Sequence, residues 1–282
     1  MKKPRGHYEQ RPIKGEKLYP VLFRLGPLTI YSYGLMVAIG CLAGFFYIRG
    51  EAKRIGFDME KIMSLFLWVL ISGFVGGRIL YIFVEWERFL NEPLRTIFGR
   101  GGFVFYGGFV LAFGIGVWQI RRKSLNIWKT ADIFAPAVAV AYAIGRIGCF
   151  LNGCCYGRST DSWLGVSFPS ESPVGSLGEP LIPIQLISSL NLFIIFAVLI
   201  ILRPYKKFDG QLFWIYVLLY GVSRSIIEIF RGDPRGHIWM FYTSQFIGIV
   251  FTILALIMLR KLGREKKQSR FPVREGCPEK EL

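Results

Sequence analysis

Histidine and acidic residues are scarce in this chain. Its 282 residues include 2 histidines, His7 and His237, and 19 Asp or Glu against 35 Lys or Arg. Enzymes that use Mg²⁺ for lipid chemistry need clustered carboxylates, but Asp132 stands alone within its apolar segment. The sequence therefore argues against a metal-dependent lipid transferase.

The sequence shows neither the pattern expected of a cleaved leader peptide nor the one expected of a soluble domain. The first 27 residues form a polar tail without a short apolar core followed by small residues, so we expect no cleaved signal peptide. Basic residues flank apolar segments instead of forming a soluble basic face. The formal charge of +16 therefore indicates contact with anionic lipid, and we expect no nucleic-acid partner.

Long apolar runs dominate what remains. A helix needs about 20 apolar residues to cross the hydrocarbon core. Segments of that kind occur at 28–48, 62–84, 103–120, 128–151, 183–202, 211–230 and 239–259. The sequence predicts an all-α integral membrane protein with about seven transmembrane helices in a domain at 28–260. A loop rich in Gly, Pro and Ser at 152–182 separates the fourth helix from the fifth, and a basic tail follows at 261–282.

Loop charges predict the orientation, because cytoplasmic loops are rich in Lys and Arg. One set of loops carries Arg49, Lys53, Arg54, Lys61, Arg121, Arg122, Lys123, Lys129, Arg203, Lys206 and Lys207. The opposite set carries Arg88, Arg95, Arg100, Arg158, Arg231 and Arg235. We expect an inner-membrane protein with its carboxyl terminus in the cytoplasm and its amino terminus and the loop 152–182 outside. The basic residues of the amino-terminal tail are the one feature against this orientation.

Polar side chains inside the apolar runs gather in one predicted layer. A charge at the bilayer centre costs about 2.5–3.5 kcal/mol on insertion scales. With the orientation above, the outer half of each helix carries one such group: Tyr33, Arg78, Tyr106, Arg146, Gln185, Arg224 and Gln245. Each arginine could instead reach the interface or pair with a carboxylate. A layer of arginines close to lipid head groups nevertheless favours a phosphate site, because a guanidinium binds phosphate through two parallel hydrogen bonds.

The sixth predicted helix places three charges on one face. Arg224, Glu228 and Arg231 are separated by four and then three residues, a spacing that aligns side chains on a helix. Arg224 and Glu228 can therefore pair within the helix, either as a purely structural ion pair or as part of a substrate site.

Three of the five cysteines cluster near the end of the fourth predicted helix. Cys149, Cys154 and Cys155 lie within seven residues of one another, whereas Cys41 lies in an apolar run and Cys277 in the polar tail. Structural zinc usually takes four ligands, and the cluster offers three. Packing is the favoured interpretation, with a disulfide or a zinc site as alternatives.

Several short motifs resemble one membrane family in the expected order. The stretch Gly145–Gly157 resembles the signature of the prolipoprotein diacylglyceryl transferases. Further matches are Tyr33-Gly34-Leu35-Met36, Gly76-Gly77-Arg78, Tyr106-Gly107-Gly108, Pro183-Ile184-Gln185-Leu186 and Arg224–Arg231. The resemblance covers about residues 30–260.

The resemblance implies transfer of the diacylglyceryl group of phosphatidylglycerol to the lipobox cysteine of a prolipoprotein, the first step of lipoprotein maturation. It also implies that the reaction needs no metal and no organic cofactor. Its phosphatidylglycerol-binding arginine falls on Arg146 and its essential sixth-helix arginine on Arg224. We expect catalytic roles for these two residues and for Tyr106. Expected substrate-binding residues are Tyr33, Arg78, Arg146, Asn152, Gln185, Glu228 and Arg231.

This chain departs from the family pattern at several positions. Tyr106 stands where the family often has His, so Tyr106 is a candidate proton acceptor or a hydrogen-bonding group for the lipid head. Cys149 and Cys154 replace the usual Asn and an acidic residue, and Ile187-Ser188 replaces Tyr-Glu. Two other functions stay open: a related membrane lipid transferase with another donor or acceptor, and a non-enzymatic transporter.

Overall fold

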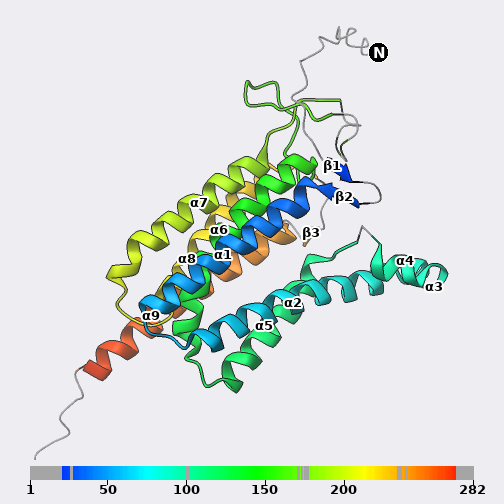
Figure 1. The fold of residues 1–282 in the computed structure, drawn as a ribbon. Helices are drawn as coiled ribbons and strands as arrows, with labels where there is room; N and C mark the ends of the chain where they lie inside the picture. Colours follow the sequence, from blue (N-terminus) through cyan, green and yellow to red (C-terminus); the bar gives the residue numbers. More distant parts are fainter. Residues whose placement is uncertain are drawn as a thin grey trace, which may run out of the picture. The chain divides into compact units, whose positions relative to one another are not determined.

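The computed structural model describes residues 21–25, 28–99, 102–169, 172, 174, 178–233, 237–238 and 241–270. Most of the predicted tail 1–27 lies outside these residues, as do His7, Cys277 and the end of the basic tail. Helices make up most of the described chain (Figure 1). Two small antiparallel hairpins accompany them: β1 (Val21–Leu25) pairs with β2 (Leu28–Tyr31), and β3 (His237–Ile238) pairs with β4 (Phe241–Tyr242). The helices are α1 (Ser32–Arg54), α2 (Met59–Val84), α3 (Trp86–Asn91), α4 (Pro93–Phe98), α5 (Phe105–Arg122), α6 (Ile127–Asn152), α7 (Ile184–Leu202), α8 (Gln211–Ile229) and α9 (Thr243–Arg270).

Each apolar run of the sequence corresponds to one long helix. Six of these helices, α1, α2, α6, α7, α8 and α9, are long and apolar enough to cross a membrane. The run at 103–120 forms α5, which has 18 residues and spans about 27 Å at 1.5 Å per residue. The predicted all-helical membrane fold is confirmed, and the count of about seven long helices agrees with it.

The helix ends differ from the prediction in three places. Residues 28–31 form β2, paired with β1, so α1 begins at Ser32 instead of at residue 28. Phe241 and Tyr242 pair with β3, so the last long helix begins at Thr243. The same helix continues to Arg270, and the first part of the predicted basic tail is therefore helical. Apolar composition cannot distinguish a strand from a helix end, which explains the first two errors.

The chain divides into two compact units. Unit 1 comprises Met1–Leu42, Ala139–Val198 and Val217–Ala255, within the described residues. Unit 2 comprises Ala43–Val138, Leu199–Tyr216 and Leu256–Leu282, with the same restriction. The boundaries fall inside α1, α6, α7, α8 and α9.

Small residues bring the helices of unit 1 together. A Cβ atom at Gly40 of α1 would lie 2.7 Å from the carbonyl oxygen of Ala141 in α6, and one at Gly221 of α8 would lie 2.9 Å from that of Gly248 in α9. Backbones approach this closely only where a side chain is absent. Ser189 of α7 adds a hydrogen bond of 2.8 Å to the carbonyl oxygen of Ala143 in α6.

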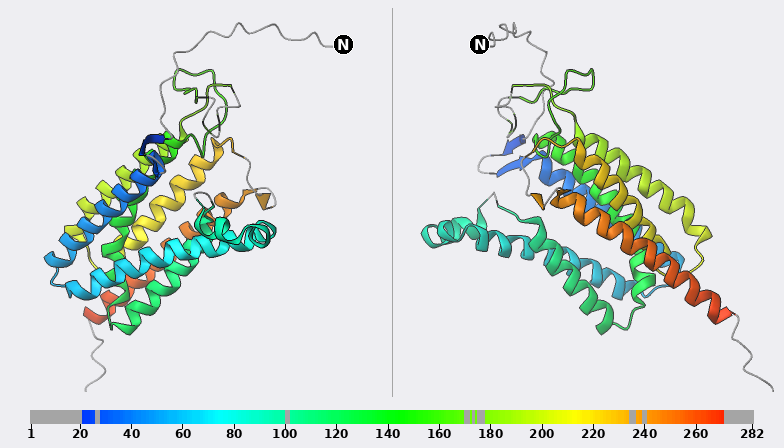
Figure 2. Two further views of the ribbon diagram at one scale, coloured as in Figure 1. Left: turned by 45° about the vertical axis from the view of Figure 1, so that its right-hand side comes forward. Right: turned by 180° about the vertical axis from the view of Figure 1, so that it is seen from behind.

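The helices α2 and α5 form a tight antiparallel pair in unit 2 (Figure 2). A Cβ atom at Gly76 would lie 2.5 Å from the carbonyl oxygen of Gly107, and one at Gly108 would lie 2.6 Å from that of Gly73. A Cβ atom at Gly107 would overlap the carbonyl oxygen of Gly76. The two glycine motifs of the sequence are therefore the contact surface between these two helices.

Replacing Gly107 with Ala should destabilise this pair. The added methyl group must push α5 away from α2, and overpacking of this kind costs about 1–3 kcal/mol. Gly114 lies on the same helix, and a Cβ atom added there would have no neighbour within 4 Å, so Gly114→Ala should leave stability unchanged or raise it slightly. Melting temperatures of the two purified variants in one detergent test this. Equal melting temperatures would contradict the close approach.

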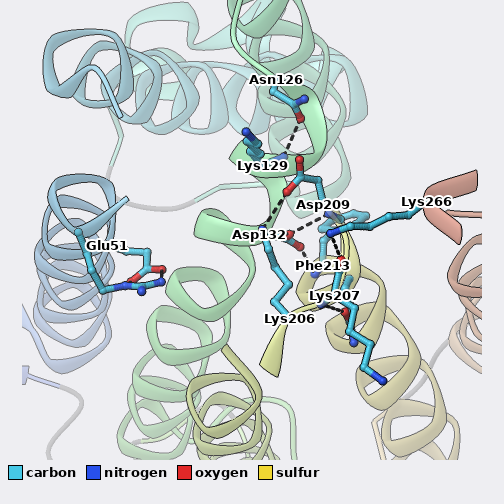
Figure 3. Close-up of polar contacts among 12 residues, drawn as sticks. Glu51, Asn126, Lys129, Asp132, Lys206, Lys207, Asp209, Phe213 and Lys266 are labelled. Atoms are coloured by element: carbon cyan, nitrogen blue, oxygen red, sulfur yellow. Dashed lines mark hydrogen bonds and ion pairs between the residues drawn. The ribbon is translucent and has the colours of Figure 1, made fainter. Parts of the chain in front are cut away.

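A buried carboxylate organises the start of α8 in unit 2 (Figure 3). Asp132 of α6 accepts hydrogen bonds from the backbone N–H groups of Gly210 at 2.8 Å and Phe213 at 3.0 Å, and from Lys206 Nζ at 3.1 Å. Backbone N–H groups at a helix start lack partners within the helix, so Asp132 caps α8 from another helix. Burial alone would lower the pKa of Lys206, but Asp132 and Asp209 raise it above its usual value.

Glu51 holds the end of α1 in the same unit (Figure 3). It accepts from Arg54 Nη2 at 2.6 Å and from Arg203 Nη1 at 2.7 Å, and Arg203 follows the last residue of α7. Asp132 and Glu51 together fix the turn between α7 and α8. Asp132, the carboxylate that stands alone within its apolar segment of the sequence, is therefore a structural residue.

Candidate active site

A small cavity in unit 1 lies between α6, α7 and α8. The space open to the centre of a water molecule is about 10 Å³, room for roughly one water. Its lining combines two arginines, two tyrosines and several small polar groups: Tyr142, Arg146, Ser188, Asn191, Leu192, Tyr220, Ser223, Arg224 and Ile227. Arg146 of α6 and Arg224 of α8, both predicted as catalytic residues, therefore line the same cavity.

Arg146 is a buried cation with an incomplete set of partners. It is 8% exposed, and its Nη2 donates a hydrogen bond to the hydroxyl of Tyr142, one helical turn earlier. The guanidinium carbon lies 4.7 Å from the centre of the Tyr142 ring. Among the described residues, Nε has no hydrogen-bond partner, and Arg146 makes no ion pair with a carboxylate. An uncompensated buried charge is costly, so this guanidinium is suited to an anionic ligand.

Arg224 is held by the ion pair that its spacing predicts. Its Nη2 lies 2.7 Å from Glu228 Oε2, and Glu228 is 1% exposed. Arg231 Nε lies 3.9 Å from the same carboxylate oxygen and makes two bonds to Asp233, at 2.8 and 2.9 Å. Arg224 and Glu228 pair within α8 as predicted, whereas Arg231 lies two residues beyond the end of that helix at Ile229, so the prediction that all three charges share one helical face is wrong for Arg231. Two carboxylates thus balance Arg224 and Arg231, and Arg146 supplies the remaining positive charge.

Five polar residues of the cavity were not predicted from the sequence: Tyr142, Ser188, Asn191, Tyr220 and Ser223. Asn191 Nδ2 donates to Ser223 Oγ at 2.9 Å and thereby links α7 to α8. The rings of Tyr142 and Tyr220 lie 6.0 Å apart. Each tyrosine precedes an arginine by four residues, Tyr142 before Arg146 and Tyr220 before Arg224. This repeated spacing was the available signal.

Three further predicted residues lie in unit 1 around the carboxyl-terminal end of α6. Gln185, fully buried at 0% exposure, donates from Nε2 to the Cys154 carbonyl oxygen at 2.8 Å. Tyr33 packs close to Gly148, where an added Cβ atom would lie 3.3 Å from the tyrosine ring. Asn152 is the last residue of α6. These residues surround the cysteine segment and do not line the cavity described above.

Arg78 and Tyr106 belong to unit 2. The guanidinium of Arg78 donates to the carbonyl oxygens of Ile97 at 2.8 Å, Gly99 at 2.7 Å and Gly102 at 2.7 Å. These hydrogen bonds stabilise the connection between α4 and α5, so Arg78 has a structural role. Tyr106, near the start of α5, is 55% exposed. Contact of either residue with substrate stays a prediction.

The loop between α6 and α7 docks on the end of α8. Gly157 pairs with Arg231 as an isolated antiparallel bridge, and the Arg158 N–H donates to the Phe230 carbonyl oxygen at 3.0 Å. The Gly157 N–H donates to the carbonyl oxygen of Ile182 at 3.1 Å. The described part of the predicted loop is irregular, as expected, and it fixes the backbone around Arg231.

Comparison with known proteins distinguishes a transferase from a transporter. The family model of the prolipoprotein diacylglyceryl transferases matches residues 20–260. The chain belongs to the prolipoprotein diacylglyceryl transferase family. Proteins named phosphatidylglycerol–prolipoprotein diacylglyceryl transferase are similar along most of their length. That of Clostridium tetani is 38% identical, covering 88% of this chain and 99% of the relative, and that of Geobacter sulfurreducens is 33% identical, covering 88% and 96%.

Membership of the prolipoprotein diacylglyceryl transferase family makes this chain a membrane-embedded transferase. The transporter interpretation is therefore set aside. A second clostridial relative, from Clostridium perfringens, is 37% identical over 87% of this chain and 96% of its own length. The resemblance predicted from six short motifs is confirmed over nearly the whole described chain.

Proposed function

We propose that this chain transfers the diacylglyceryl group of phosphatidylglycerol to the thiol of a lipobox cysteine in prolipoproteins. A carbon–sulfur bond forms at the glyceryl carbon, the carbon–oxygen bond to phosphate breaks, and glycerol phosphate leaves. The thiol proton passes to a base or to the solvent. The observation that carries this proposal is Arg146, a buried guanidinium in the cavity without a carboxylate partner among the described residues.

Phosphate binding requires a rearrangement of this cavity. The space between α6, α7 and α8 holds about one water, whereas a phosphoglycerol group is several times larger. We propose that the phosphate takes the place of the Tyr142 hydroxyl on Arg146 and receives a second contact from Arg224. The two arginines then stabilise the charge that builds up on the leaving phosphate, and such preorganised donors act most strongly at developing charge.

The acceptor thiol must lose its proton. A cysteine with a reference pKa of about 8.5 is mostly protonated at neutral pH, and nearby cations favour the thiolate. We propose Arg146 and Arg224 as the source of that field. Tyr106 is the proposed proton acceptor, with a hydrogen bond to the lipid head group as its other role. Tyr106→Phe distinguishes the two, because only a proton acceptor should change the pH profile of transfer.

We further propose that the carboxyl terminus is cytoplasmic and that α6 and the loop 152–182 reach the outer side. The asymmetry of loop charges supports this orientation. A phosphatase that works only outside the cytoplasm, fused after Leu282, should be inactive, and the same enzyme inserted near Trp163 should be active. Trp163 is 89% exposed, so the insertion disturbs little packing. The reverse pattern would overturn the orientation.

The function is tested with purified full-length protein in phosphatidylglycerol vesicles and a synthetic lipobox peptide. Mass spectrometry should show the peptide gaining one diacylglyceryl group. A peptide with Ser in place of the lipobox Cys should stay unmodified, and vesicles of phosphatidylethanolamine should give no product. Transfer from the second lipid alone would favour a related transferase with another donor.

A further inference from the structure

Three thiols converge just beyond the helix that carries Arg146. The Sγ atoms of Cys149, Cys154 and Cys155 all lie within 4.8 Å of one another, and all three cysteines are half-buried free thiols. Packing alone gives no reason for three sulfur atoms to meet. Sulfur ligands of a tetrahedral metal with bonds of about 2.3 Å lie roughly 3.8 Å apart, so these three sulfur atoms would need to approach one another by at most about 1 Å to bind one.

The end of α6 explains why residues five positions apart come together. The Cys154 N–H donates to the Cys149 carbonyl oxygen at 3.1 Å, and the Gly153 N–H donates to that of Phe150 at 3.0 Å. Gly153 has a φ of +67°. These three features form a Schellman motif, which brings the residue after the left-handed glycine against the residue five positions earlier. Cys154 is thereby placed against Cys149.

Cys155 joins the other two through an uncommon backbone conformation. Its φ is +61°, and Ser124 is the one other non-glycine residue with positive φ among the described residues. Such a conformation is strained for L-amino acids, because Cβ crowds the following carbonyl oxygen. Strained residues of this kind are concentrated at functional sites, where the surrounding structure holds them in place.

Neighbouring side chains fix the backbone of the cysteine segment and place positive charge near the thiols. The fully buried Gln185 donates to the Cys154 carbonyl oxygen at 2.8 Å and fixes the turn. Arg146 and Arg231 both lie within electrostatic range of the Cys155 thiol. Three thiolates with one divalent cation carry a net charge of −1, and Arg146, which no carboxylate balances among the described residues, offsets it.

We propose that Cys149, Cys154 and Cys155 bind a thiophilic divalent cation of the zinc class as three thiolates, with the fourth position open to water or an external ligand. On binding, three S–H bonds lose their protons to the solvent and three metal–sulfur bonds form, so no oxidant or reductant is needed. The site goes beyond the proposed transfer and depends on neither lipid nor peptide. It replaces the packing role that the sequence alone favours.

The test uses the full-length protein, reduced and stripped of metal, in detergent. Titration with Cd²⁺ should produce the ultraviolet thiolate-to-metal absorption band with an end point of one equivalent, and Zn²⁺ should displace Cd²⁺. Because protons compete for the thiolates, apparent affinity should rise with pH. Changes outside the ligand shell already lower metal affinity about 10–100-fold, so Cys149→Ser and Cys154→Ser should lower it at least as much. Cys41→Ser and Cys277→Ser are matched controls and should bind normally.

Cys155→Gly separates ligation from folding. Glycine adopts positive φ without strain, so this variant should melt no lower than the wild type and yet bind Cd²⁺ at least about tenfold more weakly. Unchanged binding in Cys155→Gly or in the triple Ser variant would overturn the site. The metal site would also be overturned if the reduced wild-type protein failed to bind Cd²⁺ or Zn²⁺. If alkylation of the protein isolated from membranes then revealed a disulfide among these cysteines, a disulfide would replace the metal site as their role. None of these readouts depends on transferase activity.

Discussion

Arg146→Lys is expected to impair transfer nearly as much as Arg146→Ala. Lysine keeps the positive charge but lacks the planar pair of donors that matches two phosphate oxygens. A hydrogen bond to a charged group contributes about 1.5–3 kcal/mol. If that bond tightens in the transition state, its loss slows transfer by about tenfold to a hundredfold. Initial rates of transfer from phosphatidylglycerol to the lipobox peptide measure the effect.

Arg95→Lys is the matched control for Arg146→Lys. Its side chain is 71% exposed and forms a surface ion pair with Glu92 at 3.2 Å. The same chemical change there should leave the transfer rate unchanged. Melting temperatures of both variants should stay near that of the wild type. Near-normal transfer by Arg146→Lys would contradict the bidentate phosphate site and leave only a general electrostatic role.

Glu228→Ala should be the most destabilising single change in the candidate site. The carboxylate is 1% exposed and lies 2.7 Å from Arg224 and 3.9 Å from Arg231. Removing one partner of a buried ion pair leaves a buried charge unpaired and costs about 3–5 kcal/mol. We expect a clear drop in melting temperature and loss of transfer. Glu92→Ala removes an exposed pair of the same type and should cost less than about 1 kcal/mol.

A double variant separates the structural role of this ion pair from its functional role. Replacing both partners of a buried pair with apolar residues of similar volume is often neutral or stabilising. Arg224→Met combined with Glu228→Leu should therefore recover much of the melting temperature lost in Glu228→Ala. Transfer should stay absent, because the phosphate loses Arg224. Recovery of transfer in the double variant would show that Arg224 serves stability alone.

Most of the fold could be predicted from the sequence because membrane helices are defined by length and apolarity. The helix ends could not. Residues 28–31 and 241–242 are as apolar as the helices they precede, and strand pairing there depends on a partner segment. The division into two units also has no sequence signal, since its boundaries fall inside continuous helices.

The candidate site was partly predictable for a physical reason. Charged residues in apolar runs are costly, so Arg146, Arg224 and Glu228 were conspicuous. Tyr142 and Tyr220 were missed because tyrosine is common in membrane helices, and only the shared spacing of four residues before an arginine marks them. The convergence of Cys149 with Cys154 was unpredictable from ligand spacing, because it depends on how the backbone turns at Gly153.

The most direct test of the central claim measures both products of the proposed reaction at once. Purified wild-type protein in phosphatidylglycerol vesicles is mixed with the lipobox peptide, and thioether-linked peptide and glycerol phosphate are quantified over time. The account predicts that the two products appear in equal amounts, and that both fall together in Arg146→Ala. Glycerol phosphate released without modified peptide, or modified peptide formed at the wild-type rate by Arg146→Ala, would contradict it.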